Sequence, residues 1–117
     1  MQIKVSVARC ESYERDKANA AMEKVLGALG GIDGFMGGGK RVIVKPNLVM
    51  AKRPEDAVTT HPVLVEALCR QIIAAGGHPV IAESPGGPLN VSLLKRIYRL
   101  TGMEEAAKKT GAELNLN

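Results

Sequence analysis

The sequence predicts an α/β fold, with a mainly parallel sheet of about four strands joined by crossover helices. Short apolar runs alternate along the chain with longer stretches in which apolar residues recur every three or four positions. The 117 residues suffice for one small domain. We expect this domain to be incomplete, because the last predicted strand reaches the final residue with no turn after it.

The first two predicted elements differ in the spacing of their apolar residues. In residues 3–8, Ile3, Val5 and Val7 alternate with more polar or smaller residues, which indicates a strand with one buried face. Residues 18–29 then carry an apolar stripe of helical spacing that stops at a glycine pair. Six of the ten residues 30–39 are glycine, so a loop is expected there.

The next strand, residues 41–45, is an uninterrupted Val-Ile-Val run with charged ends, which predicts an interior strand buried on both faces. Residues 48–58 are too long for a tight turn and indicate a surface excursion. The remaining elements follow from the same patterns: a helix over 62–75, a strand over 78–83, a helix over 91–102 capped by Asn90, a short helix over 103–109, and a strand over 112–117.

Composition excludes several classes of protein. The net charge of +4 comes from scattered basic residues, and with only Tyr13, Phe35 and Tyr98 as aromatics we expect no binding to nucleic acid. No apolar run approaches the roughly 18 residues of a membrane span, and the N-terminus lacks a signal-peptide pattern, so a cytoplasmic protein without membrane partners is predicted. Cys10 and Cys69 are expected to be reduced thiols.

Polar residues gather where the second predicted strand ends and the next helix begins. Lys45 and Asn47 follow the strand, and Thr59, Thr60 and His61 precede the helix. In open α/β sheets the carboxyl ends of strands form a crevice into which helix N-termini direct N–H groups. We therefore predict a site for a small anionic ligand there, with Lys45 and His61 as candidates for proton chemistry.

A loop after the third predicted strand completes this expected site. Ser84 supplies a hydroxyl, and Gly86 and Gly87 allow a ligand to approach backbone N–H groups. If the strands are parallel, this loop lies at the same edge of the sheet as Lys45. The structural alternatives are a lysine at a strand end, threonines that cap a helix, a histidine that hydrogen-bonds locally, and a plain turn.

Three further motifs of the sequence have a possible chemical role. Gly34, Gly39 and Lys40 have the spacing of a phosphate-binding P-loop, but Arg41 replaces the Ser or Thr that holds magnesium, and the glycines precede a strand instead of following one. No metal site is expected, because no second ligand stands at suitable spacing from His61. Cys10 remains a candidate nucleophile, although Arg9 and Glu11 affect its thiol in opposite directions.

Several segments together resemble the N-terminal part of the domain of unknown function 362 family, whose members are often called iron-sulfur cluster-binding proteins. The matching segments cover almost the whole chain: Val-Ala-Arg-Cys (7–10) with Tyr13, Val-Lys-Pro-Asn-Leu (44–48), Pro-Glu-Asp-Ala-Val-Thr-Thr-His-Pro (54–62) and Glu-Ser-Pro-Gly (83–86). The family's typical Gly-Asp/Glu-Ser-Pro-Gly turn begins here with Ala82 in place of glycine.

The resemblance implies that residues 1–117 are one α/β domain, the N-terminal portion of a longer, redox-associated protein. Many family members carry a ferredoxin-like region with 4Fe-4S clusters after this domain. The cluster is thus expected in a full-length protein, and no cofactor is expected in this chain. The expected partners are a small anionic ligand and either the remainder of the protein or a second copy. Two functions stay open: an enzyme domain, or a non-catalytic scaffold that docks the iron-sulfur region.

Overall fold

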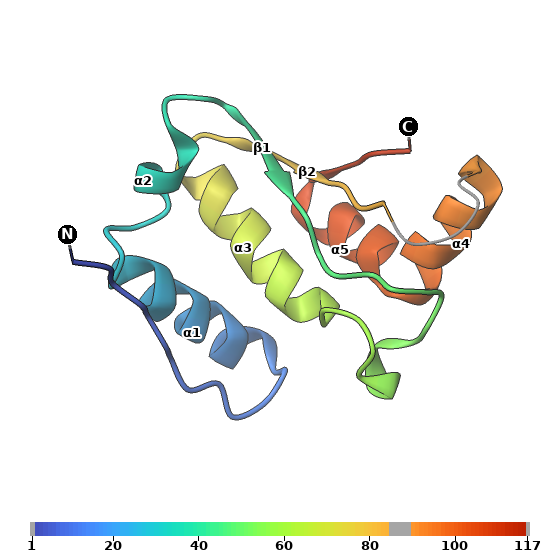
Figure 1. Ribbon diagram of the computed structural model, residues 1–117, viewed down its shortest axis with the longest axis horizontal. Helices are drawn as coiled ribbons and strands as arrows, with labels where there is room; N and C mark the ends of the chain where they lie inside the picture. Colours follow the sequence, from blue (N-terminus) through green and yellow to red (C-terminus); the bar gives the residue numbers. More distant parts are fainter. Residues whose placement is uncertain (1, 85–89, 117) are drawn as a thin grey trace.

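The computed structural model describes residues 2–84 and 90–116. Within them the chain forms a three-stranded parallel sheet of order β1-β2-β3, covered by helices (Figure 1). The predicted α/β class with a mainly parallel sheet is confirmed. The elements are α1 (Arg15–Gly27), α2 (Asp33–Met36), β1 (Arg41–Val44), η1 (Pro54–Asp56), α3 (Pro62–Ala74), β2 (His78–Ile81), α4 (Val91–Leu100), α5 (Met103–Thr110) and β3 (Glu113–Leu114).

Each pair of neighbouring strands is joined through helices. Helix α3 connects β1 to β2, and α4 and α5 lie between β2 and β3 in the chain. Helix α3 contacts both β1 and β2, and it has α1 on one side and α5 on the other (Figure 1). The amino ends of α3 and α4 are capped by side chains, because His61 accepts a hydrogen bond from Val63 and Asn90 accepts one from Leu93.

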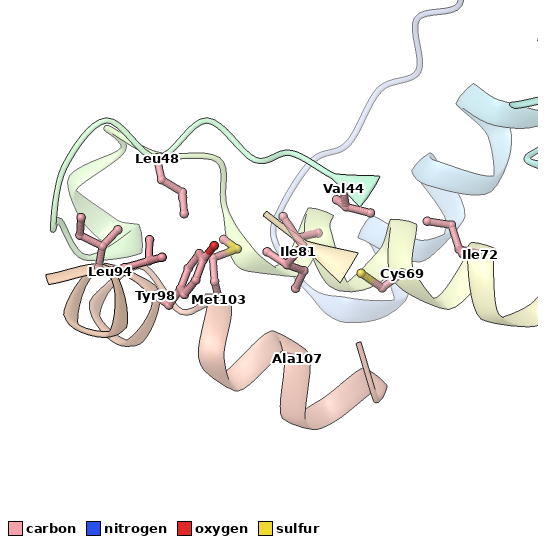
Figure 2. Close-up of a cluster of buried hydrophobic side chains, with 11 residues drawn as sticks. Val44, Leu48, Cys69, Ile72, Ile81, Leu94, Tyr98, Met103 and Ala107 are labelled. Carbon is pink, nitrogen blue, oxygen red and sulfur yellow. The ribbon is translucent and has the colours of Figure 1, made fainter. Parts of the chain in front are cut away.

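The core lies between the sheet and the helices α3, α4 and α5. Tyr98, Ile72 and Ile81 are among its largest fully buried side chains (Figure 2). The phenol of Tyr98 donates a hydrogen bond of 2.9 Å to the backbone oxygen of Asn115, which satisfies its polar end. Leu48, expected on a surface excursion, is fully buried in this cluster, so the segment after β1 is part of the core.

The predicted strand over residues 3–8 is wrong for this structure. These residues form no strand, and the side chains of Ile3, Val5 and Val7 are 83%, 83% and 89% exposed. The alternating pattern identifies a segment able to form a strand, but a strand also needs a neighbour with which to hydrogen-bond. The glycine-rich segment 30–39 likewise differs from the expected loop, because it contains the short helix α2.

The expectation that residues 41–45 form an interior strand is also wrong. Among the described residues β1 pairs only with β2, so β2 is the central strand and β1 lies at the edge. Val44 is buried in the core, whereas Ile43 is 66% exposed. A continuous apolar run therefore does not establish burial on both faces here, since Ile43 lies on the opposite face from Val44.

Candidate functional site

The carboxyl ends of β1 and β2 lie next to each other. The two strands are parallel, with Val44 opposite Ile81, and the amide of Ala82 donates a hydrogen bond of 3.0 Å to the backbone oxygen of Val44. Lys45 directly follows β1 and Glu83 is the second residue after β2, and their side chains meet beyond the strand ends. The structure thus places Lys45 and Ser84 at the same edge of the sheet.

Glu83 is the centre of this edge. Its side chain is only 5% exposed, and its carboxylate oxygen Oε1 lies 3.0 Å from Nζ of Lys45. Oε1 also accepts a hydrogen bond of 3.0 Å from the amide of Ser84, and Oε2 accepts one of 3.0 Å from the amide of Leu48. One carboxylate therefore connects the residues that follow β1 to those that follow β2.

The contacts of Glu83 determine its charge. Burial alone would favour the neutral acid, but hydrogen bonds from Leu48, Lys45 and Ser84 stabilise the anion and hold the pKa of Glu83 below its usual value. The carboxylate is therefore ionised near neutral pH and fixes the lysine ammonium beside it. Lys45 itself stays 67% exposed, so its remaining N–H donors are open to solvent.

Asn47 and Thr60 form a second connection across this region. The amide of Asn47 donates a hydrogen bond of 2.9 Å to Oγ1 of Thr60, and the amide of Thr60 donates one of 3.1 Å to the backbone oxygen of Asn47. This reciprocal pair ties the segment after β1 to the segment before α3. The Thr60 hydroxyl thus accepts a hydrogen bond from the other loop and does not cap α3. The residue that caps α3 is the next one in the chain.

His61 supplies that cap. Its Nδ1 accepts a hydrogen bond of 3.1 Å from the amide of Val63, so in the neutral ring the proton is on Nε2. Burial lowers the pKa of His61 below its ordinary value, against the opposing effect of the carboxylates of Glu66 and Glu55. The ring of Tyr13 stacks on the imidazole, with 3.7 Å between the ring centroids and 6° between the planes.

Two hollows lie beside this stacked pair. One, of about 360 Å³, is lined by Tyr13, His61, Thr59 and residues of the η1 turn. The other, of about 280 Å³, is lined by Tyr13, His61 and residues that include Arg15, Glu66 and Lys109.

The Oγ1 atom of Thr59 is buried without a hydrogen-bond partner among the described residues, so Thr59 does not cap α3 either.

The predicted site residues therefore fall into three groups. Lys45 and Ser84 meet at Glu83, Asn47 pairs with Thr60, and His61 stacks on Tyr13. Within residues 2–84 and 90–116, no hydrogen bond or ion pair joins His61 to Lys45 or Ser84. Gly86 and Gly87 lie outside the described residues.

The residue that the sequence argument missed is Glu83. The sequence pattern places it at a strand end and in a turn, although an acidic residue that directly follows the apolar run Val80-Ile81-Ala82 is itself a signal. In a parallel sheet a carboxylate at that position faces the end of the neighbouring strand, and Lys45 directly follows that strand.

The cysteines do not fit a 4Fe-4S site, which needs four thiolate ligands. The chain has two cysteines. Cys69 is buried in α3, and burial raises the pKa of its thiol to about 11, which opposes the thiolate form that a cluster requires. Cys10 is exposed and lies near the N-terminus. Among the described side chains, no group of three or more His, Cys, Asp or Glu residues is arranged to hold a metal ion.

A parallel sheet with a buried glutamate and an exposed lysine at its carboxyl edge defines an α/β protein with a cluster of polar residues at one end of its sheet. The family described as Domain of unknown function (DUF362) matches residues 42–116, and this chain belongs to that family. The match includes Lys45, Asn47, His61 and Glu83.

The chain is also similar to the thylakoid-associated protein sll1697 of Synechocystis sp. (strain ATCC 27184 / PCC 6803 / Kazusa), at 38% identity over 81 residues. The similar region makes up 69% of this chain and 25% of that protein, so the chain matches about a quarter of its relative's length. No solved structure matches this chain. None of the helices within the described residues is long and apolar enough to cross a membrane.

Proposed function

We propose that the carboxyl edge of the sheet binds a small anionic ligand and that Lys45 is its main contact. The observation that carries this proposal is the pair of Lys45 and Glu83, in which a buried carboxylate holds an exposed ammonium 3.0 Å away. An ammonium has three N–H donors, and a lysine held in place loses less conformational entropy when a ligand binds.

The same pair sets the kind of anion that fits. Glu83 offsets the charge of Lys45, so the edge attracts an anion through hydrogen-bond donors and through the positive end of the α3 dipole, more than through net charge. Phosphate, sulfate and carboxylates have oxygens suited to such donors. We expect modest affinity and a weak dependence on ionic strength for this reason.

His61 is the candidate catalytic residue in this proposal. Its neutral ring carries a proton on Nε2, and this proton can be donated to a bound molecule. A redox-linked enzyme in which His61 or Lys45 performs proton chemistry is one version of the proposal. Because no hydrogen bond or ion pair joins these two side chains in the described part of the chain, we assign them no shared step.

The test measures anion binding by calorimetry and by thermal unfolding, with inorganic phosphate, sulfate and a panel of carboxylates. The control is Lys40→Gln, at the opposite end of β1. A ligand at 100 times its dissociation constant stabilises a protein by about 2.7 kcal/mol. We expect Lys45→Gln to lose this stabilisation and Lys40→Gln to keep it. The same stabilisation in both variants, or none with any anion, would refute the site.

A second candidate function is a non-catalytic scaffold that docks an iron-sulfur, ferredoxin-like region of a longer protein. It is favoured by apolar side chains left exposed near β1, namely Ile43, Val49 and Met50 at 66%, 47% and 46% exposure. Titration of the isotope-labelled chain with the remaining part of a longer family member would test it. Chemical-shift changes confined to these residues would support docking.

A cytoplasmic location remains part of the proposal. Cell fractionation would test it, because the relative named above is described as thylakoid-associated. Recovery of the protein in the membrane pellet would contradict a cytoplasmic location.

A further inference from the structure

The N-terminal arm, defined here as residues 3–8, has one face of apolar side chains that nothing in the described part of the chain covers, whereas Ser6 and Ala8 on its other face are partly buried. Ile3, Val5 and Val7 are each more than 80% exposed, and the arm takes no part in the sheet. Three β-branched side chains at alternate positions are the pattern of a strand with one buried face. The arm thus has the sequence of a strand, but it lacks a strand's neighbour.

The free edge of β1 is the matching feature. Within the described residues β1 is hydrogen-bonded only to β2, so the backbone groups along its outer side have no partner strand. Ile43 lies on this strand at 66% exposure. The edge is short, with Arg41 at its start and Lys45 just after its end, but its unpaired backbone groups can accept a further strand.

The arm does not reach the edge of its own chain. In Figure 1 the arm runs beside α1, and α1 and α3 stand between it and β1. The residues that follow the arm lie on the same side of the molecule. Tyr13 stacks on His61, and residues that include Arg9 and Cys10 line a groove of about 280 Å³ against Lys17 and Ala20 of α1.

We propose that the arm of one copy pairs with the free edge of β1 in a second copy, and that the second copy returns its own arm in the same way. Because the exchange is reciprocal, each copy gives and receives the same arm, and the interface closes into a two-fold dimer. It is independent of the anion site, because it uses neither Lys45 nor Glu83.

The surface available suits a dimer. Three apolar side chains from each arm, together with Ile43 from each edge, would be withdrawn from water. If each side chain buries the apolar area typical of a valine or isoleucine in a core, the total is on the order of 500–1,000 Å² of apolar surface. The hydrogen-bonded backbone adds to this figure, which brings the total to about the 1,000 Å² that a specific interface needs.

The first test measures the mass of the 117-residue chain by light scattering over a range of concentrations, for the wild type, Val5→Lys and Val91→Lys. Val5 is exposed, so its replacement leaves the fold intact. Val91 is 51% exposed at the start of α4 and serves as the control. We expect a monomer–dimer equilibrium in which Val5→Lys raises the dissociation constant on the order of 100-fold, because each dimer loses two buried valines. Val91→Lys should leave it unchanged.

The second test asks which chain provides the edge. In a Cys10→Ser background, Val5→Cys chains are mixed with Ile43→Cys chains and oxidised, and the disulfide-linked products are identified by mass. A linked pair with one chain of each kind supports the exchange. A monomer at all concentrations, a dimer insensitive to Val5→Lys, or a disulfide that forms within single chains carrying both cysteines would each overturn it.

Discussion

Glu83 connects two strands through three contacts on a single carboxylate. Its neighbours in space are Lys45 and the amides of Leu48 and Ser84, and its side chain is nearly inaccessible to water. A buried carboxylate has a large desolvation cost, which hydrogen bonds from charged and backbone donors offset. The residue is therefore expected to matter for folding as well as for the position of Lys45.

Replacement of Glu83 by glutamine should destabilise the protein by about 2 kcal/mol. Glutamine has the same shape as glutamate, but one of its two terminal atoms is an NH₂ group that cannot accept a hydrogen bond. At least one of the donors around Glu83 therefore loses its acceptor. The matched control is Glu104→Gln, which removes a partly exposed ion pair with Lys108 on α5, and for which a change within about 0.5 kcal/mol is expected. Urea unfolding measures both, and equal effects would contradict the role assigned to Glu83.

His61 makes stability depend on pH. In the unfolded chain its imidazole takes up a proton near pH 6.5, whereas burial keeps the pKa of His61 lower in the folded protein. Between these values the unfolded state binds more protons, so the folded state loses stability as the pH falls. The contribution of His61 is fully present above pH 6.5 and is lost as the pH falls through the folded pKa.

The variant His61→Asn should reduce this dependence. Asparagine keeps an oxygen that can cap α3 but does not titrate. We expect the loss of stability between pH 7.5 and pH 5.5 to be smaller in His61→Asn than in the wild type, as measured by urea unfolding at each pH. His78→Asn is the control, since it removes the other histidine and leaves the cap in place. An unchanged slope in His61→Asn would show that another group is responsible.

At the scale of elements, the turn between α4 and α5 supports the start of α3. Gly102 has φ of +84°, a conformation that side chains disfavour, and a Cβ atom there would lie 2.7 Å from Cγ of Pro62. Pro62 is the first residue of α3 and directly follows His61. The close approach therefore holds the end of α3 that carries the candidate site.

The variant Gly102→Ala should cost about 1–3 kcal/mol, because it adds both backbone strain and a clash with Pro62. The control is Gly27→Ala at the last residue of α1, where a Cβ would meet no atom within 4 Å. There we expect no loss, and a gain of up to about 1 kcal/mol from helix propensity. Denaturant midpoints compare the two. A Gly102→Ala protein as stable as the wild type would contradict the packing described.

Across the whole molecule, the sequence predicted best what depends on near neighbours. The cap at Asn90 and the short helix predicted over 103–109 follow from residues within a few positions, and the structure confirms both, with α5 at Met103–Thr110. The alternation of apolar and polar residues over 3–8 is equally local, yet the strand predicted from it does not form. A strand requires a partner strand, which the alternation does not identify. Leu48 and Glu83 are 35 positions apart, and only the tertiary fold brings them into contact.

The same limit applies to the site. Parallel connections correctly place Lys45 and Ser84 at one edge, because the rule depends on topology and not on side-chain detail. The rule does not indicate that a buried glutamate occupies the space between them. Nor does it indicate that Tyr13 covers one face of His61, since that contact spans 48 positions of sequence.

The two thiols offer a measure of how the whole molecule opens. Cys69 is fully buried in the core, and burial raises the pKa of its thiol to about 11, whereas Cys10 is exposed. A thiol reagent at pH 8 should therefore modify Cys10 at once and Cys69 only when the core opens. When opening and closing are fast relative to modification, the rate at which Cys69 is modified reports the free energy of unfolding. If Glu83→Gln loses about 2 kcal/mol, Cys69 should react about 30-fold faster in that variant. Rapid modification of both thiols in the wild type would show that α3 does not pack on the sheet as described.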